Sequence, residues 1–265
     1  MARFRGPAFR ACWLVSAAVA LSWPGTPCRG APWVDWREAG PFVCRADFPL
    51  HDLEGLFDEL AQLQQDLVRY LGIRPANETI ELYLFRDQAS YRRFVRQHLP
   101  EVPYRRALYV RSGGRGMVFA QLGRDFAVDL RHECTHALLH ASLPLVPLWL
   151  DEGLAEYFEL PAESRAFDNP HLGRIRWGAR FRITPRIENL EKLSDLSEMG
   201  GSEYRNAWAW VHFMLHGSPQ AYGELIAFLA DIQAHTPPGR LSQRLHARIP
   251  QLDRRFAAHF SSWKR

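Results

Sequence analysis

The sequence lacks the patterns of fibrous, repetitive or low-complexity proteins: it has no internal repeat, no heptad run and no biased tract. It also lacks an excess of charge in its main part. The chain carries 33 basic and 29 acidic residues, and residues 1–30 hold four arginines and no acid, so positions 31–265 carry 29 of each. This balance gives no indication of a nucleic-acid partner or of binding to an anionic surface.

Cysteine is scarce, since only two of the four cysteines, Cys44 and Cys134, lie beyond residue 30. At most one disulfide can therefore form in that part of the chain. An oxidising compartment would favour it. The alternative is a pair of small buried thiols, a common environment for free cysteine.

Long hydrophobic runs are nearly absent, and the clearest one is Ala11–Trp23, preceded by Arg3, Arg5 and Arg10. This run is shorter than the roughly 20 residues that span a bilayer. Proline and glycine follow it directly. The pattern predicts a signal peptide over residues 1–30, cleaved after Gly30, and hence an exported protein, periplasmic or secreted. No stable membrane span is expected after cleavage; retention of the run as a membrane anchor is the alternative.

The remaining residues, 31–265, fit one domain with an α/β lobe over 31–142 and a helical lobe over 143–265. Apolar alternation predicts strands near 42–48 and 78–85 and a hairpin of 107–111 with 117–122. Helical spacing predicts helices over 51–71, ending at Gly72, and over 87–98, with more helices over 202–215, 218–233, 239–247 and 250–262. The fold class is therefore α+β, with a small mixed sheet followed by a mostly helical lobe.

Residues 132–136 read His-Glu-Cys-Thr-His, within a segment whose apolar positions predict a helix capped by Asp125. Positions i and i+4 lie on one face of a helix, so His132 and His136 can direct their imidazoles at one metal ion. Glu133 lies one step round the helix, where its carboxylate can reach a water bound to that metal. This is the arrangement of a metal-assisted hydrolase.

A second predicted helix, from about 147 to 160, carries Asp151, Glu152 and Glu156. The short connection before it contains two prolines and turns the chain back, so that the two helices pack together. Catalytic zinc usually takes three protein ligands and leaves one position open, and Glu152 is the expected third ligand. Glu156 and, as the other candidate, Asp151 can accept a hydrogen bond from the far nitrogen of a ligand histidine. The alternative for both carboxylates is that they are ordinary charged side chains on the solvated face of a helix.

These two segments, His132-Glu133-x-x-His136 and Trp149-Leu150-x-Glu152-Gly153-x-Ala155, resemble the gluzincin metallopeptidases. The resemblance is closest to uncharacterised bacterial peptidase-MA-like domains and covers about residues 78–216. It implies a zincin-like fold with an edge strand beside the active-site helix. It also implies one Zn²⁺ ion held by His132, His136 and Glu152, with Glu133 as general base.

The resemblance implies two further parts of the site. An edge strand beside the cleft would pair with the substrate backbone. The residues expected to do so are Gly116, Met117, Val118 and Phe119. The alternative is that this hairpin is purely structural. A donor for the oxyanion would stand on a helix after the third ligand, where Tyr204 is the candidate. The strand has no glutamate to hold a substrate's free amine, which favours an endopeptidase over an aminopeptidase.

We therefore expect an exported zinc-dependent peptidase that hydrolyses peptide bonds by metal-activated water, with peptide or protein as substrate. Two alternatives stay open. The chain can be a non-catalytic peptide-binding module that retains the zinc site, or a zinc amidohydrolase that acts on a non-peptide bond. The sequence gives no indication of cleavage specificity or of oligomeric state.

Overall fold

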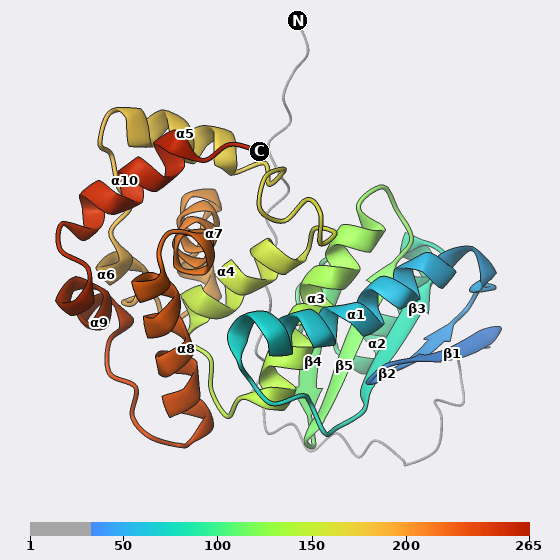
Figure 1. Ribbon diagram of the computed structural model, residues 1–265. Coiled ribbons are helices and arrows are strands. Elements are labelled where there is room, and N and C mark those ends of the chain that lie inside the picture. Colours follow the sequence, from blue (N-terminus) through green and yellow to red (C-terminus); the bar gives the residue numbers. More distant parts are fainter. Residues whose placement is uncertain (1–32) are drawn as a thin grey trace, which may run out of the picture.

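The computed structural model describes residues 33–265 (Figure 1). The predicted signal peptide, residues 1–30, lies outside these described residues. Within them, no helix is both long and apolar enough to cross a membrane.

The first half of the chain builds a five-stranded mixed sheet in the order β1-β2-β3-β5-β4. Its outer pairs, β1 with β2 and β4 with β5, are antiparallel, whereas β3 is parallel to both β2 and β5. The strands are β1 (Asp35–Ala39), β2 (Phe42–Ala46), β3 (Ile80–Phe85), β4 (Ala107–Ser112) and β5 (Arg115–Gln121). The α+β class is confirmed, and β1 is an additional strand that the sequence pattern does not predict.

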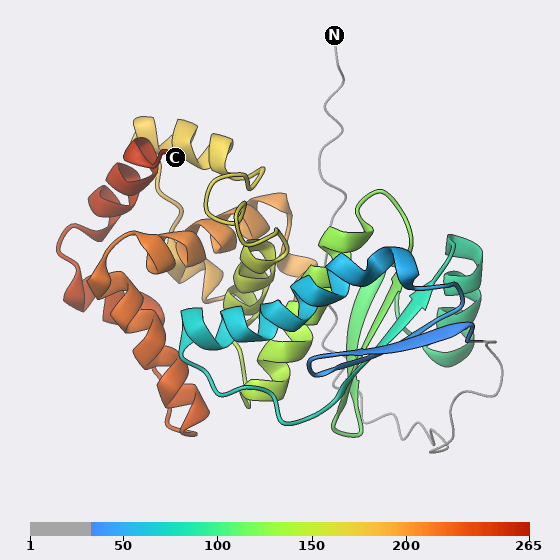
Figure 2. The same cartoon turned by 45° about the vertical axis from the view of Figure 1, so that its right-hand side comes forward.

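Helices cover both faces of this sheet (Figure 2). On one face lie α1 (Glu54–Leu71), preceded by a short 3-10 turn (His51–Leu53), and α3 (Phe126–Ser142); on the other lies α2 (Gln88–His98). Helix α1 ends where predicted, because Gly72 adopts the left-handed conformation with φ 64° and its N–H bonds to the carbonyl of Val68.

The second half is helical. Its elements are α4 (Leu148–Phe158), α5 (Leu172–Arg180), α6 (Ile187–Leu190), a 3-10 turn (Leu196–Glu198), α7 (Gly201–His216), α8 (Pro219–Gln233), α9 (Leu241–Arg248) and α10 (Leu252–Ser262). One cluster of buried residues runs from β2 through α3 and α4 to α10. The sheet part and the helical part therefore share a core.

The expectation that residues 116–121 form an edge strand is wrong. Strand β5 lies inside the sheet, with β3 on one side (Ile80 beside Gly116) and β4 on the other (Val110 beside Met117). Its buried, continuous apolar stretch, Met117 to Ala120, is typical of a strand enclosed on both faces. The edge next to α3 is β4, which has no further strand on its outer side among residues 33–265.

Both cysteines beyond residue 30 are free and buried. Burial raises the pKa of the Cys44 and Cys134 thiols well above the usual value. The disulfide alternative is therefore not formed, and the thiols act as small core side chains.

Candidate metal centre

Helix α3 is buried along most of its length, so that His132, Glu133 and His136 all lie inside the protein. Their spacing places the two imidazoles one above the other, with ring centroids 4.9 Å apart. Asp125 stands at the N-cap position but makes no side-chain cap bond. Its carboxylate instead lies 2.5 Å from the guanidinium of Arg106, which also binds Asp129 in the first turn.

Helix α4 packs against α3 and brings Glu152, which is fully buried, to the two histidines. Its Oε2 atom lies 3.5 Å from Nε2 of His132 and 3.7 Å from Nε2 of His136. Zinc binds nitrogen and oxygen at about 2.0–2.2 Å, so two ligand atoms on one tetrahedral ion lie about 3.4 Å apart. The three donor atoms, which all lie within 4.8 Å of one another, could therefore hold a single metal ion.

The far nitrogens of both histidines face carboxylates. Nδ1 of His136 lies 3.0 Å from Oδ2 of Asp151, and Nδ1 of His132 lies 3.0 Å from Oε2 of Glu159. A carboxylate at Nδ1 fixes the imidazole tautomer and leaves the Nε2 lone pair for a metal. The orientation of both ligand histidines thus suits metal binding.

The prediction for Asp151 agrees with this geometry, whereas the one for Glu156 needs correction. The carboxylate that faces Nδ1 of His132 belongs to Glu159, three residues further along the chain than Glu156. The end of α4 lies beside His132, so the position belongs to its C-cap residue. The Glu156 carboxylate stays in the neighbourhood, within 4.8 Å of His132 and Glu159, and lies 3.1 Å from Nε2 of His171.

Sequence reasoning missed two members of the cluster, Glu159 and His140. Nε2 of His140 lies 3.0 Å from the same Asp151 oxygen that faces His136. Both have a signal in the spacing: His140 follows His136 by four residues, and Glu159 follows Glu152 by seven. Each repeat keeps side chains on one helix face.

The charges in this cluster favour a cation. Burial alone would lower the pKa of His132, but the carboxylates of Glu152 and Glu159 raise it to about 10. Burial alone would likewise raise the pKa of Asp151, but His136 and His140 hold it well below its usual value. Buried carboxylates gathered around imidazoles need a positive charge, which in this arrangement is a proton or a metal ion.

Glu133 differs from the other carboxylates. Burial raises its pKa above the ordinary value, and the negative charge of Glu152 adds to that effect, while His132, His136 and Arg105 oppose it. Its Oε2 atom is buried and makes no hydrogen bond within the described part of the chain. A raised pKa is the direction of shift that favours a carboxylate as general base.

Helix α7 supports the metal centre from behind α4. A Cβ atom on Gly153 would lie 2.7 Å from the carbonyl oxygen of Ala207, so only glycine permits this approach of the two helices. Tyr204 is buried on α7, one turn before Ala207. The structure thus brings the helix of Tyr204 to the residue next to Glu152, and the role of its hydroxyl stays a prediction.

No protein-family model matches this chain, and no curated protein matches it. Function is therefore argued from the geometry of the site.

Proposed function

We propose that the protein is a zinc-dependent peptidase of the gluzincin type, with a zincin-like fold. The observation that carries this proposal is the convergence of His132 Nε2, His136 Nε2 and Glu152 Oε2 at distances of 3.5 and 3.7 Å. Buried groups of this composition are able to hold a metal ion. Two histidines with one glutamate are a known ligand set of catalytic zinc.

The chain's own residues would share the work as follows. His132, His136 and Glu152 hold the ion, and Asp151 and Glu159 orient the two imidazoles. When bound, the zinc supplies Lewis acidity, which makes a water easier to deprotonate and polarises a carbonyl group. Glu133 takes the proton from the attacking water and returns it to the leaving nitrogen, a task that its raised pKa supports.

Strand β4 is our candidate for the strand that pairs with substrate, in place of the segment 116–119. It is the sheet edge next to α3, and an open edge offers regularly spaced amide and carbonyl groups to an extended peptide. Its position relative to α3 is fixed, because the guanidinium of Arg111 donates to the carbonyl of His140 and pairs with Glu78 at 3.1 Å. We keep Tyr204 as the candidate oxyanion donor.

The deciding experiment compares three variants of the purified full chain. Glu152→Ala should lose bound zinc, measured by elemental analysis, because it removes one of three ligands. Glu133→Gln should keep the zinc and lose hydrolysis of a quenched-fluorescent peptide library. Glu163→Gln is the matched control, since Glu163 is exposed and lies outside both helical motifs.

Each outcome separates the alternatives. Unchanged zinc content in Glu152→Ala contradicts the ligand assignment, and full activity in Glu133→Gln contradicts the mechanism. Zinc binding without cleavage of any library peptide in the wild type would favour a peptide-binding module. Cleavage of non-peptide amides alone would favour an amidohydrolase.

A further inference from the structure

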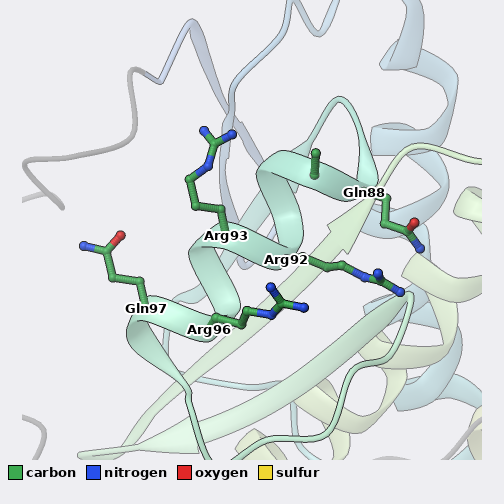
Figure 3. A pocket seen from close by; sticks show the side chains of 6 residues that line it. Gln88, Arg92, Arg93, Arg96 and Gln97 are labelled. Carbon is green, nitrogen blue, oxygen red and sulfur yellow. The ribbon is translucent and has the colours of Figure 1, made fainter.

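Helix α2 carries an arginine cluster on its outer face. Its inner face packs on the sheet through Tyr91, Phe94 and Val95, which are buried. The outer positions line a surface pocket of about 650 Å³ (Figure 3). That pocket is formed by the side chains Gln88, Ala89, Arg92, Arg93, Arg96 and Gln97 and contains no acidic residue.

No carboxylate among residues 33–265 forms an ion pair with Arg92, Arg93 or Arg96, and residues 1–32 contain no aspartate or glutamate. Arg92 stacks on the ring of Tyr104 at 3.9 Å. The nearest acid along the chain, Asp87, uses its carboxylate to cap the amides of Ala89 and Ser90. Arg93 is close enough to Asp87 to help lower the pKa of that carboxyl, whereas Arg92 and Arg96 have no paired carboxylate within the described part of the chain.

The three arginine side chains leave α2 in two directions. Figure 3 shows the three arginines extending outward from α2, with Arg92 and Arg96 directed the same way. Arg93 and Arg96 are exposed. Although the whole of positions 31–265 is balanced in charge, this helix has three arginines and no acid, so the positive charge is concentrated locally.

An exposed tryptophan lies on the same face of the sheet. Trp36 is 65 % exposed and pairs across β1 and β2 with Arg45, whose guanidinium lies over the ring of Tyr83. Tyr83 belongs to the cluster that α2 covers, so Trp36 points to the α2 side. An exposed tryptophan beside basic residues is typical of a surface that enters the headgroup region of a membrane.

The chain's apolar run lies a short distance before Trp33 in the sequence. Trp33, the first described residue, packs against Phe94 of α2 with ring centroids 6.0 Å apart. Residues 24–32 separate Trp33 from the run Ala11–Trp23 and span at most about 30 Å when extended. If this run is retained as a membrane anchor rather than cleaved after Gly30, the side of the sheet that carries α2 is held within that distance of it.

We propose that the side of the sheet that carries α2, with Arg92, Arg93 and Arg96 on that helix and Trp36 on β1, docks on an anionic phospholipid membrane. A retained apolar segment alone would give marginal binding, and a basic patch close to it in the chain would be the second attachment that makes binding stable. The metal centre lies on the opposite side of the sheet, with α1 and α3 (Figure 2), so docking leaves the catalytic face directed away from the lipid.

Vesicle flotation of the full chain tests this. One set of vesicles is phosphatidylcholine alone, and the other is phosphatidylcholine with about 30 % phosphatidylglycerol. We expect tighter binding to the anionic vesicles. Each arginine contributes about fivefold, so R92Q/R93Q/R96Q should lose about 100-fold in affinity for them and little for neutral vesicles. W36A should weaken binding to both.

A matched control removes the same charge elsewhere. R69Q/R74Q/R240Q takes three exposed arginines from segments that carry no exposed tryptophan, and should leave vesicle binding unchanged. Equal loss in both triple variants, or equal binding of the wild type to both lipids, would overturn the proposal. Loss of binding when inorganic phosphate replaces chloride at constant ionic strength would also overturn it, because it would indicate a site for a free anion.

Discussion

Substitution of Gly153 by alanine tests whether the contact between α4 and α7 positions Glu152. Gly153 lies in the interior of α4, directly after the third candidate ligand. A Cβ atom there would meet the Ala207 carbonyl oxygen at 2.7 Å, its carbonyl carbon at 2.8 Å and Val211 Cγ2 at 2.9 Å. Ordinary contacts of a Cβ begin at 3.4 Å, so the two helices must separate by about 0.7 Å.

The magnitude follows from two opposing effects. Overpacking of this kind costs about 1–3 kcal/mol, and the obstacle here is backbone, which cannot rotate away, so we expect a value near 3 kcal/mol. Alanine regains about 1 kcal/mol over glycine within a helix. The net loss is therefore about 2 kcal/mol, or a fall in Tm of about 4–8 °C for a domain of this size. Displacement of Glu152 should also weaken zinc binding about tenfold.

Gly223→Ala is the matched control, because Gly223 also lies inside a helix, α8, and a Cβ atom there would meet nothing within 4 Å. That variant should gain up to about 1 kcal/mol. Calorimetry gives both Tm values, and competition with a zinc chelator gives the affinity. Gly153→Ala as stable as the wild type would refute the packing argument, and lost stability with unchanged zinc affinity would refute the link to Glu152.

Three further predictions follow from the same structure. Asp151→Asn should lower zinc affinity about 10–100-fold, measured by chelator competition, because it removes the carboxylate at His136 Nδ1; unchanged affinity would exclude that role. A zinc concentration of 100 Kd should raise the free energy of unfolding by about 2.7 kcal/mol, so removal of the zinc by a chelator should lower Tm. The Tm of Glu152→Ala should not change on addition of the chelator. Acid should destabilise the helical part, since burial lowers the pKa of His212 to about 3 and of His216 and His259 to about 4. The unfolded chain, in which histidine has a pKa near 6.5, binds more protons than the folded one, so stability is lost as pH falls from about 6.5. Urea titrations should show a loss of about 2 kcal/mol between pH 7 and 5 from His212 alone. A gain in stability over this range would contradict the sign.

The sequence predicts those parts of the site that depend on local geometry. His132 and His136 share a face because a helix repeats every 3.6 residues, and Glu152 reaches them because the short proline-containing connection forces α4 back onto α3. The element boundaries near Gly72 and Asp87 were also predictable, since both residues have strong end signals.

The features of the fold and site that depend on which helices and strands are neighbours could not be predicted from local sequence patterns. Residues 107–111 and 117–122 form the predicted hairpin, but nothing local tells which of its strands faces outward. The parallel pairing of β3 with β5, set by the crossover through α2, decides it. Similarly, Glu156 and Glu159 lie on one helix face, and only the crossing of α3 and α4 determines that Glu159 meets His132.

The position of the three candidate ligands along the chain has a consequence for folding. They all fall within residues 132–152, on one helical hairpin, so closing the metal site requires only a short loop. The residues that pack against this hairpin come from distant segments of the chain. Glu59 forms an ion pair with Arg131, and the backbone of Ala207 lies against Gly153. If the candidate site takes zinc as proposed, the metal can bind before α1 and α7 dock during folding. Zinc present from the start of refolding should then raise the refolding rate more than zinc added late in refolding.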